Sequence, residues 1–156
     1  MSTLIVLVGP TGVGKTAVSI QIAQHLNSPI MNVDSRQLYR EIPIGTAAPT
    51  AIEQRTVRHY FVGTQTITDY YSAAQFETEA LRVAQTYFEN GGKMLLASGG
   101  SMLYIDALCK GIDDIPTIDA ETRKLLQQKL AHQGLAELTK ELQQLDSEYY
   151  ELVDKK

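Results

Sequence analysis

The N-terminal part of the chain reads L-I-V-L-V from Leu4 to Val8 and continues as G-P-T-G-V-G-K-T from Gly9 to Thr16. The second segment fits the phosphate-binding pattern G-x-x-x-x-G-K-[ST]. The apolar run before it is typical of a buried strand in a parallel sheet, and Val18, Ile22 and Leu26 after it share one face of a helix. A strand, a glycine loop and a helix therefore follow one another as the motif requires.

Each residue type in this loop has its own chemical use. Glycines allow several backbone N–H groups to point into one concavity, and the helix that begins near Lys15 adds the positive end of its dipole. Lys15 supplies a mobile positive charge for terminal phosphate oxygens, and the Thr16 hydroxyl can bind Mg²⁺. The loop therefore predicts a bound di- or triphosphate, held by Gly9, Pro10, Thr11, Gly12, Val13, Gly14, Lys15 and Thr16.

Length and composition limit the class of protein. The 156 residues suffice for one domain with a core, and 44% hydrophobic and 21% charged residues are ordinary for a folded chain. The net charge of −4 comes from residues 113–156, so composition gives no basic patch for nucleic acid. The one cysteine, Cys109, excludes an internal disulfide and is expected to be packed. No membrane span or signal peptide is expected, which favours a cytoplasmic protein.

Strand and helix patterns alternate along residues 1–112. Short apolar runs at 29–33, 59–62 and 94–97 predict further strands, and a capping box of Ser72 and Gln75 predicts a helix that ends near Gly91. The fold class is therefore α/β, with a P-loop-type parallel sheet in a three-layer sandwich. Residues 113–156 follow as a short helical segment, broken at Gly134, with Leu125, Leu126 and Leu130 on its expected buried face. No strand follows, so the sheet is expected to be incomplete.

Two more segments accompany the phosphate loop: D-S-R-Q at Asp34–Gln37 and G-G-S-M-L-Y at Gly99–Tyr104. With the loop, they resemble the tRNA dimethylallyltransferase (isopentenyltransferase) family, whose members carry G-P-T-[AG]-x-G-K-[ST], D-S-R/A-Q, T-A-K-P and G-G-T-x-L-Y. Order and spacing match from about Leu4 to Asp146. Two positions depart from the pattern: Ala48 stands where the family usually has lysine, and Ser101 where it has threonine.

The resemblance implies transfer of a dimethylallyl group from dimethylallyl diphosphate to the exocyclic amine of an adenosine beside the tRNA anticodon. It implies that Lys15 and Mg²⁺ on Thr16 act on the diphosphate, that Thr11 contacts the diphosphate or the reacting amine, and that Asp34 is the general base. Contacts to tRNA are implied for Asp34, Ser35, Arg36, Gln37, Ser101 and Arg123. Residues from 113 onward resemble the start of the family's inserted tRNA-binding helices. Because family members are about twice as long, this chain is expected to have little activity alone. A full-length member is expected to be a monomer, and self-association of this chain stays open.

Other interpretations stay open at this point. Asp34 could assist a Mg²⁺ ligand or cap a helix, Arg36 and Arg123 could be solvated charges, and Gly99 and Gly100 could serve a tight turn. His25 and His59 lack metal-ligand spacing, which favours core or surface positions. The alternative functions are a small-molecule kinase that uses ATP, a transferase that acts on free adenine nucleotide, and a non-catalytic binding module.

Overall fold

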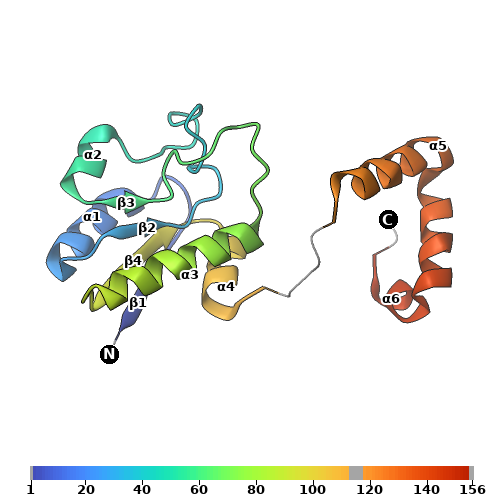
Figure 1. Ribbon diagram of the computed structural model, residues 1–156. Coiled ribbons are helices and arrows are strands. Elements are labelled where there is room, and N and C mark those ends of the chain that lie inside the picture. The colour runs from blue at the N-terminus through green and yellow to red at the C-terminus, as the bar shows by residue number, and fades with distance from the viewer. Residues whose placement is uncertain (1, 113–117, 155–156) are drawn as a thin grey trace. The chain divides into compact units, whose positions relative to one another are not determined.

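A computed structural model describes residues 2–112 and 118–154 of the chain. They divide into two compact units, Met1–Asp113 and Asp114–Lys156. The first unit contains a sheet of β1 (Thr3–Val8), β2 (Ile30–Asn32), β3 (His59–Tyr60) and β4 (Met94–Gly99), shown in Figure 1. All pairings are parallel, in the order β1-β4-β2-β3. The predicted parallel α/β sheet is confirmed, although β3 is shorter than the expected 59–62.

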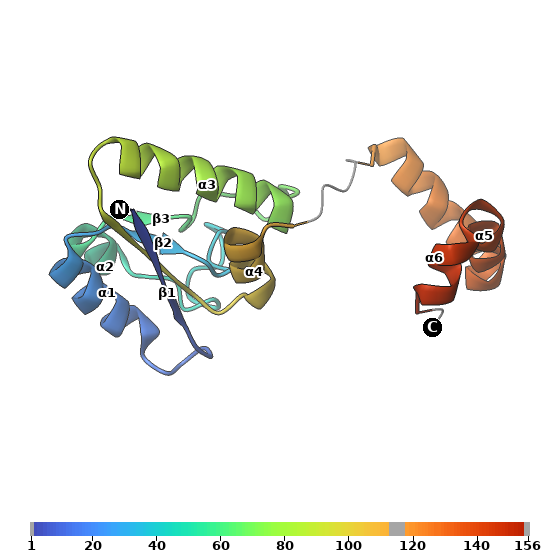
Figure 2. The same ribbon diagram turned by 90° about the horizontal axis from the view of Figure 1, so that it is seen from below.

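Helices cover both faces of this sheet. Figure 2 shows α1 (Lys15–Leu26) on one side of the strands and α3 (Ala73–Glu89) on the other, where α4 (Met102–Lys110) also packs. Ile5 and Leu7 pack on the α1 side, whereas Leu4 and Val6 pack on the α3 side. Successive side chains of a strand point to opposite faces, so an unbroken apolar run fills both layers of a three-layer fold.

The α3 helix carries the predicted capping box and the largest part of the core. The Gln75 N–H donates to Ser72 Oγ at 3.2 Å, and the Ser72 N–H donates to Gln75 Oε1 at 2.8 Å. Phe76 is fully buried and lies 5.2 Å from the Phe61 ring and 4.7 Å from the Tyr104 ring, centroid to centroid. The capping box therefore fixes where the helix starts, and the aromatic cluster fixes which face it buries.

Gly99 sets the distance between the ends of β4 and β2. A Cβ on this residue would lie 2.0 Å from the carbonyl oxygen of Val33, closer than any side chain can approach. Only glycine fits there. The close contact brings the residue after Val33, which is Asp34, next to the glycine turn that follows β4.

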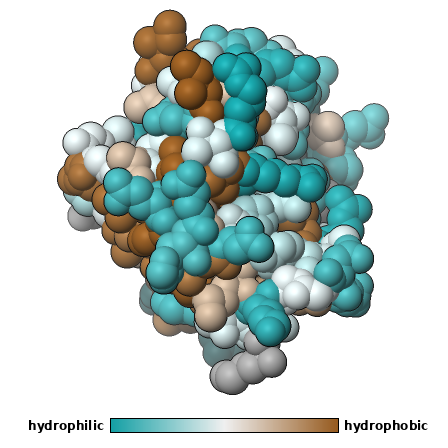
Figure 3. Space-filling model, turned by 90° about the vertical axis from the view of Figure 1, so that its left-hand side faces the viewer, coloured by the Kyte–Doolittle hydropathy of each residue, from teal (hydrophilic) through white to brown (hydrophobic). Residues whose placement is uncertain are grey.

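Two surface features differ from expectation. The short helix α2 (Ala51–Thr56) was not predicted, although Thr50 and Glu53 form its capping box. Cys109 is exposed rather than packed, although four other residues of α4 are buried, namely Tyr104, Ile105, Ala107 and Leu108. Figure 3 shows hydrophobic side chains lying among hydrophilic ones on one face of the molecule, as on most folded proteins.

The second unit consists of α5 (Ala120–Leu145) and α6 (Ser147–Leu152). The predicted break at Gly134 is confirmed by its non-helical backbone, φ 77° and ψ 174°. Lys129 Nζ contacts both carboxylate oxygens of Glu141, at 2.8 and 2.9 Å, and so joins the two halves of α5. The expected buried face is wrong: Leu125, Leu126 and Leu130 are 53%, 43% and 46% exposed. Among the described residues, every helix is too short or too polar to cross a membrane.

Candidate functional site

The phosphate loop joins β1 to α1 in a conformation that its glycines make possible. Gly12 and Gly14 both have φ +87°, a left-handed backbone that other residues rarely adopt. Gly14 is the N-cap of α1 and has no side chain to occupy the first-turn amides, which leaves them for an anionic ligand. Lys15 Nζ donates to the carbonyl of Pro10 at 2.6 Å. The ammonium is therefore held beside the loop, where phosphate oxygens can compete for it.

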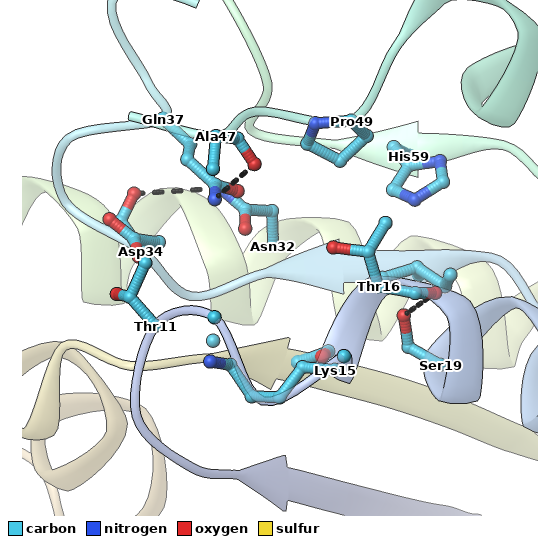
Figure 4. Close-up of a pocket in the computed structure, with 15 residues that line it drawn as sticks. Thr11, Lys15, Thr16, Ser19, Asn32, Asp34, Gln37, Ala47, Pro49 and His59 are labelled. Atoms are coloured by element: carbon cyan, nitrogen blue, oxygen red, sulfur yellow. Dashed lines mark hydrogen bonds between the residues drawn. The ribbon is translucent and has the colours of Figure 1, made fainter. Parts of the chain in front are cut away.

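A cavity of about 300 Å³ opens beside this loop, drawn in Figure 4. Half of the predicted phosphate-binding and acceptor-binding residues meet there: Thr11, Gly12, Gly14, Lys15, Thr16, Asp34 and Gln37. Gly99, from the G-G-S-M-L-Y segment, also lines the cavity. The other lining residues are not among the predicted site residues: Ser19, Ile30, Asn32, Ala47, Pro49, His59 and Ser98. The loop and the end of β2 therefore share one cavity, as parallel strands that end at one sheet edge require.

Asp34 is a buried carboxylate, 6% exposed, at the end of β2. Its Oδ1 accepts a hydrogen bond from the Arg36 N–H at 3.0 Å and lies 3.9 Å from Arg36 Nε, whose side chain is largely exposed. A Cβ on Gly100 would lie 3.9 Å from Asp34 Oδ2 and 3.4 Å from the Gly9 carbonyl oxygen. Asp34 thus caps its own turn through Oδ1, while Oδ2 lies near the junction of Gly100 with the phosphate loop.

Ser101 locks the D-S-R-Q segment to the glycine turn. Its Oγ accepts from the Ser35 N–H at 2.8 Å and donates to Ser35 Oγ at 3.0 Å, and its own N–H donates to the Val33 carbonyl at 3.2 Å. Ser35, Arg36 and Ser101 stand beside the cavity and are not among the described residues that line it. The hydroxyl that serine shares with threonine is therefore used to hold the site together.

Gln37 holds the loop T-A-A-P, Thr46–Pro49, beside the cavity. Its Nε2 donates to the carbonyls of Thr46, at 3.1 Å, and Ala47, at 3.2 Å. Ala47 has a left-handed backbone, φ +50°, which this pair of hydrogen bonds helps to hold. Ala47 and Pro49 then line the cavity, whereas Ala48 does not.

Asn32 and His59 are site residues that sequence reasoning missed. Asn32 is buried and its Nδ2 donates to the Phe61 carbonyl at 2.9 Å. His59 is half-buried, and its Nδ1 contacts the Val57 carbonyl at 2.8 Å. Burial lowers the pKa of His59, while the Val57 carbonyl and the Glu53 carboxylate oppose that shift. Pairing of β3 with β2 places His59 next to Ile30, and both residues line the cavity.

The donor set suits Mg²⁺ that arrives with a diphosphate. Among the described residues, no three His, Cys, Asp or Glu side chains gather as a metal site. Mg²⁺ commonly takes one or two protein oxygens, completes its shell with phosphate oxygens and water, and needs no such cage. The Thr16 hydroxyl and the Asp34 carboxylate line the same cavity and are oxygen donors of that kind.

The remaining predicted residue, Arg123, lies on α5 in the second unit and is exposed.

Comparison with known proteins decides the family. Residues 37–156 match the family model described as IPP transferase. The chain belongs to the IPP transferase family. The tRNA dimethylallyltransferase 1 of Bacteroides fragilis is 58% identical over 154 residues, which are 99% of this chain and 51% of that protein. The chain spans about half the length of the curated relatives it matches.

Solved structures agree with this membership. The full-length tRNA isopentenylpyrophosphate transferase of Bacillus halodurans aligns with a TM-score of 0.69 and 29% identity, over 99% of this chain and 51% of that one. A eukaryotic dimethylallyltransferase described as acting on tRNA aligns with a TM-score of 0.79 and 26% identity, over 99% of this chain and 38% of that one. The P-loop-type α/β fold is therefore that of the IPP transferase family.

Proposed function

We propose that this IPP transferase chain binds dimethylallyl diphosphate and belongs to an enzyme that transfers the dimethylallyl group to the exocyclic amine of an adenosine next to the tRNA anticodon. The observation that carries the proposal is the shared cavity. A buried carboxylate, Asp34, lines it together with Lys15 and Thr16 of the phosphate loop. A base and an anion-binding loop in one cavity suit the transfer of a group between a diphosphate and an amine.

In this reaction the adenosine nitrogen forms a bond to the first carbon of the dimethylallyl group while the carbon–oxygen bond to the diphosphate breaks. The bonding electrons leave with pyrophosphate, and the amine proton passes to Asp34. Lys15 and the first-turn amides of α1 stabilise the charge that grows on the departing oxygen. When bound through Thr16, Mg²⁺ supplies further charge neutralisation for the leaving group. Thr11 lies beside Asp34 in Figure 4 and is placed to contact the diphosphate or the amine.

The tRNA contacts belong to the same proposal. The target adenine has to leave its stack to reach a cavity of this size. Gln37 lines the cavity and Ser35, Arg36 and Ser101 lie next to it, so these residues are suited to hold the base and its neighbours. Arg123 and the helices of the second unit supply a further tRNA-binding element. Action on tRNA would place the enzyme in the cytoplasm.

A thermal-shift titration tests the ligand. Dimethylallyl diphosphate with Mg²⁺ should raise the melting temperature more than ATP with Mg²⁺ does, because the proposed function makes it the tighter-binding ligand. A ligand at about 100 times its Kd adds about 2.7 kcal/mol to the stability of the fold. Lys15→Ala should remove most of the shift, whereas His25→Asn, an exposed change at the far end of α1, should keep it. Stabilisation by ATP but not by dimethylallyl diphosphate would favour a kinase instead.

The role of Asp34 is tested separately from binding. Asp34→Asn keeps an oxygen for the Arg36 N–H and should bind dimethylallyl diphosphate about as well as the unchanged chain. It should abolish any transfer of label to an anticodon stem-loop, because an amide is not a base. Transfer by the Asn variant at the rate of the unchanged chain would remove Asp34 from the mechanism.

A further inference from the structure

The cavity has two walls of opposite chemistry. The phosphate loop presents hydrogen-bond donors, namely the first-turn amides of α1 and the ammonium of Lys15. The opposite side comes from β2 and β3 and is formed by Asn32, Asp34 and His59, which we call the acceptor wall. An anion accepts hydrogen bonds, so it can bind to the donor groups of the phosphate loop but not to the acceptor wall.

In two residues of the acceptor wall, Asn32 and His59, the side-chain N–H group donates to a backbone carbonyl. Asn32 Nδ2 donates to the Phe61 carbonyl at 2.9 Å, with a longer contact of 3.5 Å to the Asp34 carbonyl. A carbonyl can only accept, so the 2.8 Å contact between the Val57 carbonyl and His59 Nδ1 places the ring proton on Nδ1. Asn32 Oδ1 and His59 Nε2 are therefore left as acceptors.

His59 stands at the end of the cavity that holds Thr16. Figure 4 shows its ring above Thr16 and Ser19, with Asp34 and Thr11 on the other side of the view. The Ser19 hydroxyl is occupied as a donor to the Thr16 carbonyl at 2.9 Å. Burial favours the neutral ring by lowering its pKa, and a neutral ring protonated on Nδ1 cannot donate from Nε2 to a phosphate oxygen. The partner of Nε2 therefore has to be a hydrogen-bond donor.

A hydrated cation supplies such donors at this place. Mg²⁺ keeps several waters when it is bound through few protein oxygens, and those waters donate to acceptors around the ion. We propose that His59 is a positioning residue: its Nε2 accepts a hydrogen bond from a water ligand of the Mg²⁺ that Thr16 binds together with the diphosphate. This assignment rests on the proposed function. It gives His59 the task of orienting the ion, and through the ion the leaving group.

Two isosteric variants separate the roles of the ring nitrogens. His59→Asn can keep the hydrogen bond to Val57 but lacks a group at the Nε2 position, whereas His59→Gln can place an acceptor oxygen there. Calorimetric titration of pyrophosphate is carried out at a series of Mg²⁺ concentrations. We expect the Asn variant to need about tenfold more Mg²⁺ for half-maximal binding, in the range known for partners of metal ligands. The Gln variant and the control His25→Asn should remain close to the unchanged chain.

A spectroscopic measurement reports on the ring without relying on affinity. Nitrogen-15 NMR should show His59 protonated on Nδ1, and addition of pyrophosphate with Mg²⁺ should shift the Nε2 resonance more than the Nδ1 resonance. Replacement of Mg²⁺ by Mn²⁺ should broaden the His59 signals and leave those of His25 sharp. Equal melting temperatures of the unliganded variants confirm that folding is intact.

The outcomes distinguish failure of the His59 assignment from failure of the proposed function. If the Asn variant needs no more Mg²⁺ than the unchanged chain, or if it loses pyrophosphate affinity equally without Mg²⁺, the assignment of His59 is overturned. If the unchanged chain shows no Mg²⁺-dependent pyrophosphate binding, or Lys15→Ala leaves binding intact, the proposed function fails and the His59 assignment fails with it.

Discussion

The two units of this chain bury their apolar side chains to very different degrees. The α/β unit contains fully buried residues in every layer, such as Leu95 and Leu96 in β4 and Phe76 in α3. Helices α5 and α6 contain no buried residue, and Leu145 and Leu152 are 80% and 79% exposed. A parallel sheet between two helical layers makes its own core, whereas a helical hairpin with one leucine-rich face needs another surface to cover that face.

The difference means that local signals have different weight in the two units. In the α/β unit, caps and turns add to a packed core. In the helical unit, the caps, two ion pairs and the break at Gly134 are the main described features that shape it. Substitutions should therefore be severe in the first unit and mild in the second.

The largest loss of stability is expected from substitution of Gly99, which packs against the backbone of Val33. Gly99→Ala would push a methyl group against the Val33 carbonyl, 2.0 Å away, and neither strand can move without breaking the sheet. We expect a loss of more than about 4 kcal/mol in the free energy of unfolding, enough to unfold the α/β unit. Chemical denaturation followed by circular dichroism measures it.

Two other glycines serve as controls for this change. Gly134→Ala meets no atom within 4 Å and strains only its left-handed backbone, so it should cost about 1–3 kcal/mol within the helical unit. Gly45→Ala has no positive φ, and its methyl group would come no closer than 4.0 Å to the Ile42 carbonyl oxygen, an ordinary contact, so the change should be nearly neutral. Equal losses for residues 99 and 134 would contradict the contrast between the units.

The next largest effect is expected from truncation of core side chains. Phe76→Ala removes a fully buried ring from between Phe61 and Tyr104 and should cost about 3–5 kcal/mol. Leu130→Ala, at a side chain 46% exposed, should cost less than about 1 kcal/mol. If both variants lost the same stability, the helical unit would have a core that the structure does not show.

Lowering the pH should weaken the N-terminal cap of α5 but not that of α3. Asp119 caps α5 by accepting from the Thr122 N–H and hydroxyl, both at 2.7 Å, and these hydrogen bonds lower its pKa below the ordinary 3.8. A lowered folded-state pKa means that the cap stabilises the helix above the ordinary pKa and is lost as pH falls through the folded value. Hydrogen exchange of the Thr122 amide should accelerate over that acid range relative to a capless Asp119→Ala chain. The Gln75 amide, capped by the hydroxyl of Ser72, should keep its protection.

The smallest loss of stability is expected from removal of the Lys129–Glu141 ion pair within α5. Lys129→Met keeps the aliphatic stem but removes the contact with Glu141, and partly exposed pairs contribute about 0.2–1 kcal/mol. Raising the salt concentration should reduce the difference between the two chains, since screening weakens the pair. A loss that salt does not change would point to packing of the lysine stem instead.

The parts of the fold that depend on neighbours in sequence could be predicted. Gly9–Thr16, the Ser72 capping box and the break at Gly134 each carry a local pattern that the structure confirms. Helix α2 could have been found the same way, because Thr50 and Glu53 have capping-box spacing, but the helix is short and buries no residue. A segment this short has too little apolar periodicity to predict a helix.

The parts that depend on strand pairing could not be predicted. The strand order and the Gly99–Val33 contact are long-range facts that no local pattern encodes. His59 enters the cavity only because β3 pairs with β2, so a lone histidine at a strand start gave no signal. The prediction that the leucines of α5 are buried is wrong for the converse reason: the helical pattern shows which face is apolar, not what covers it.

The central position of β4 also sets the order of events in folding. Thr3 pairs with Met94 and Ile30 pairs with Leu96, so the strand that carries the phosphate loop gains its neighbour only when residues 94–99 arrive. Contacts so distant in sequence are slow to form. During synthesis, the phosphate loop should therefore stay unordered until almost the whole α/β unit has left the ribosome, and nascent chains halted before β4 should fail to bind pyrophosphate.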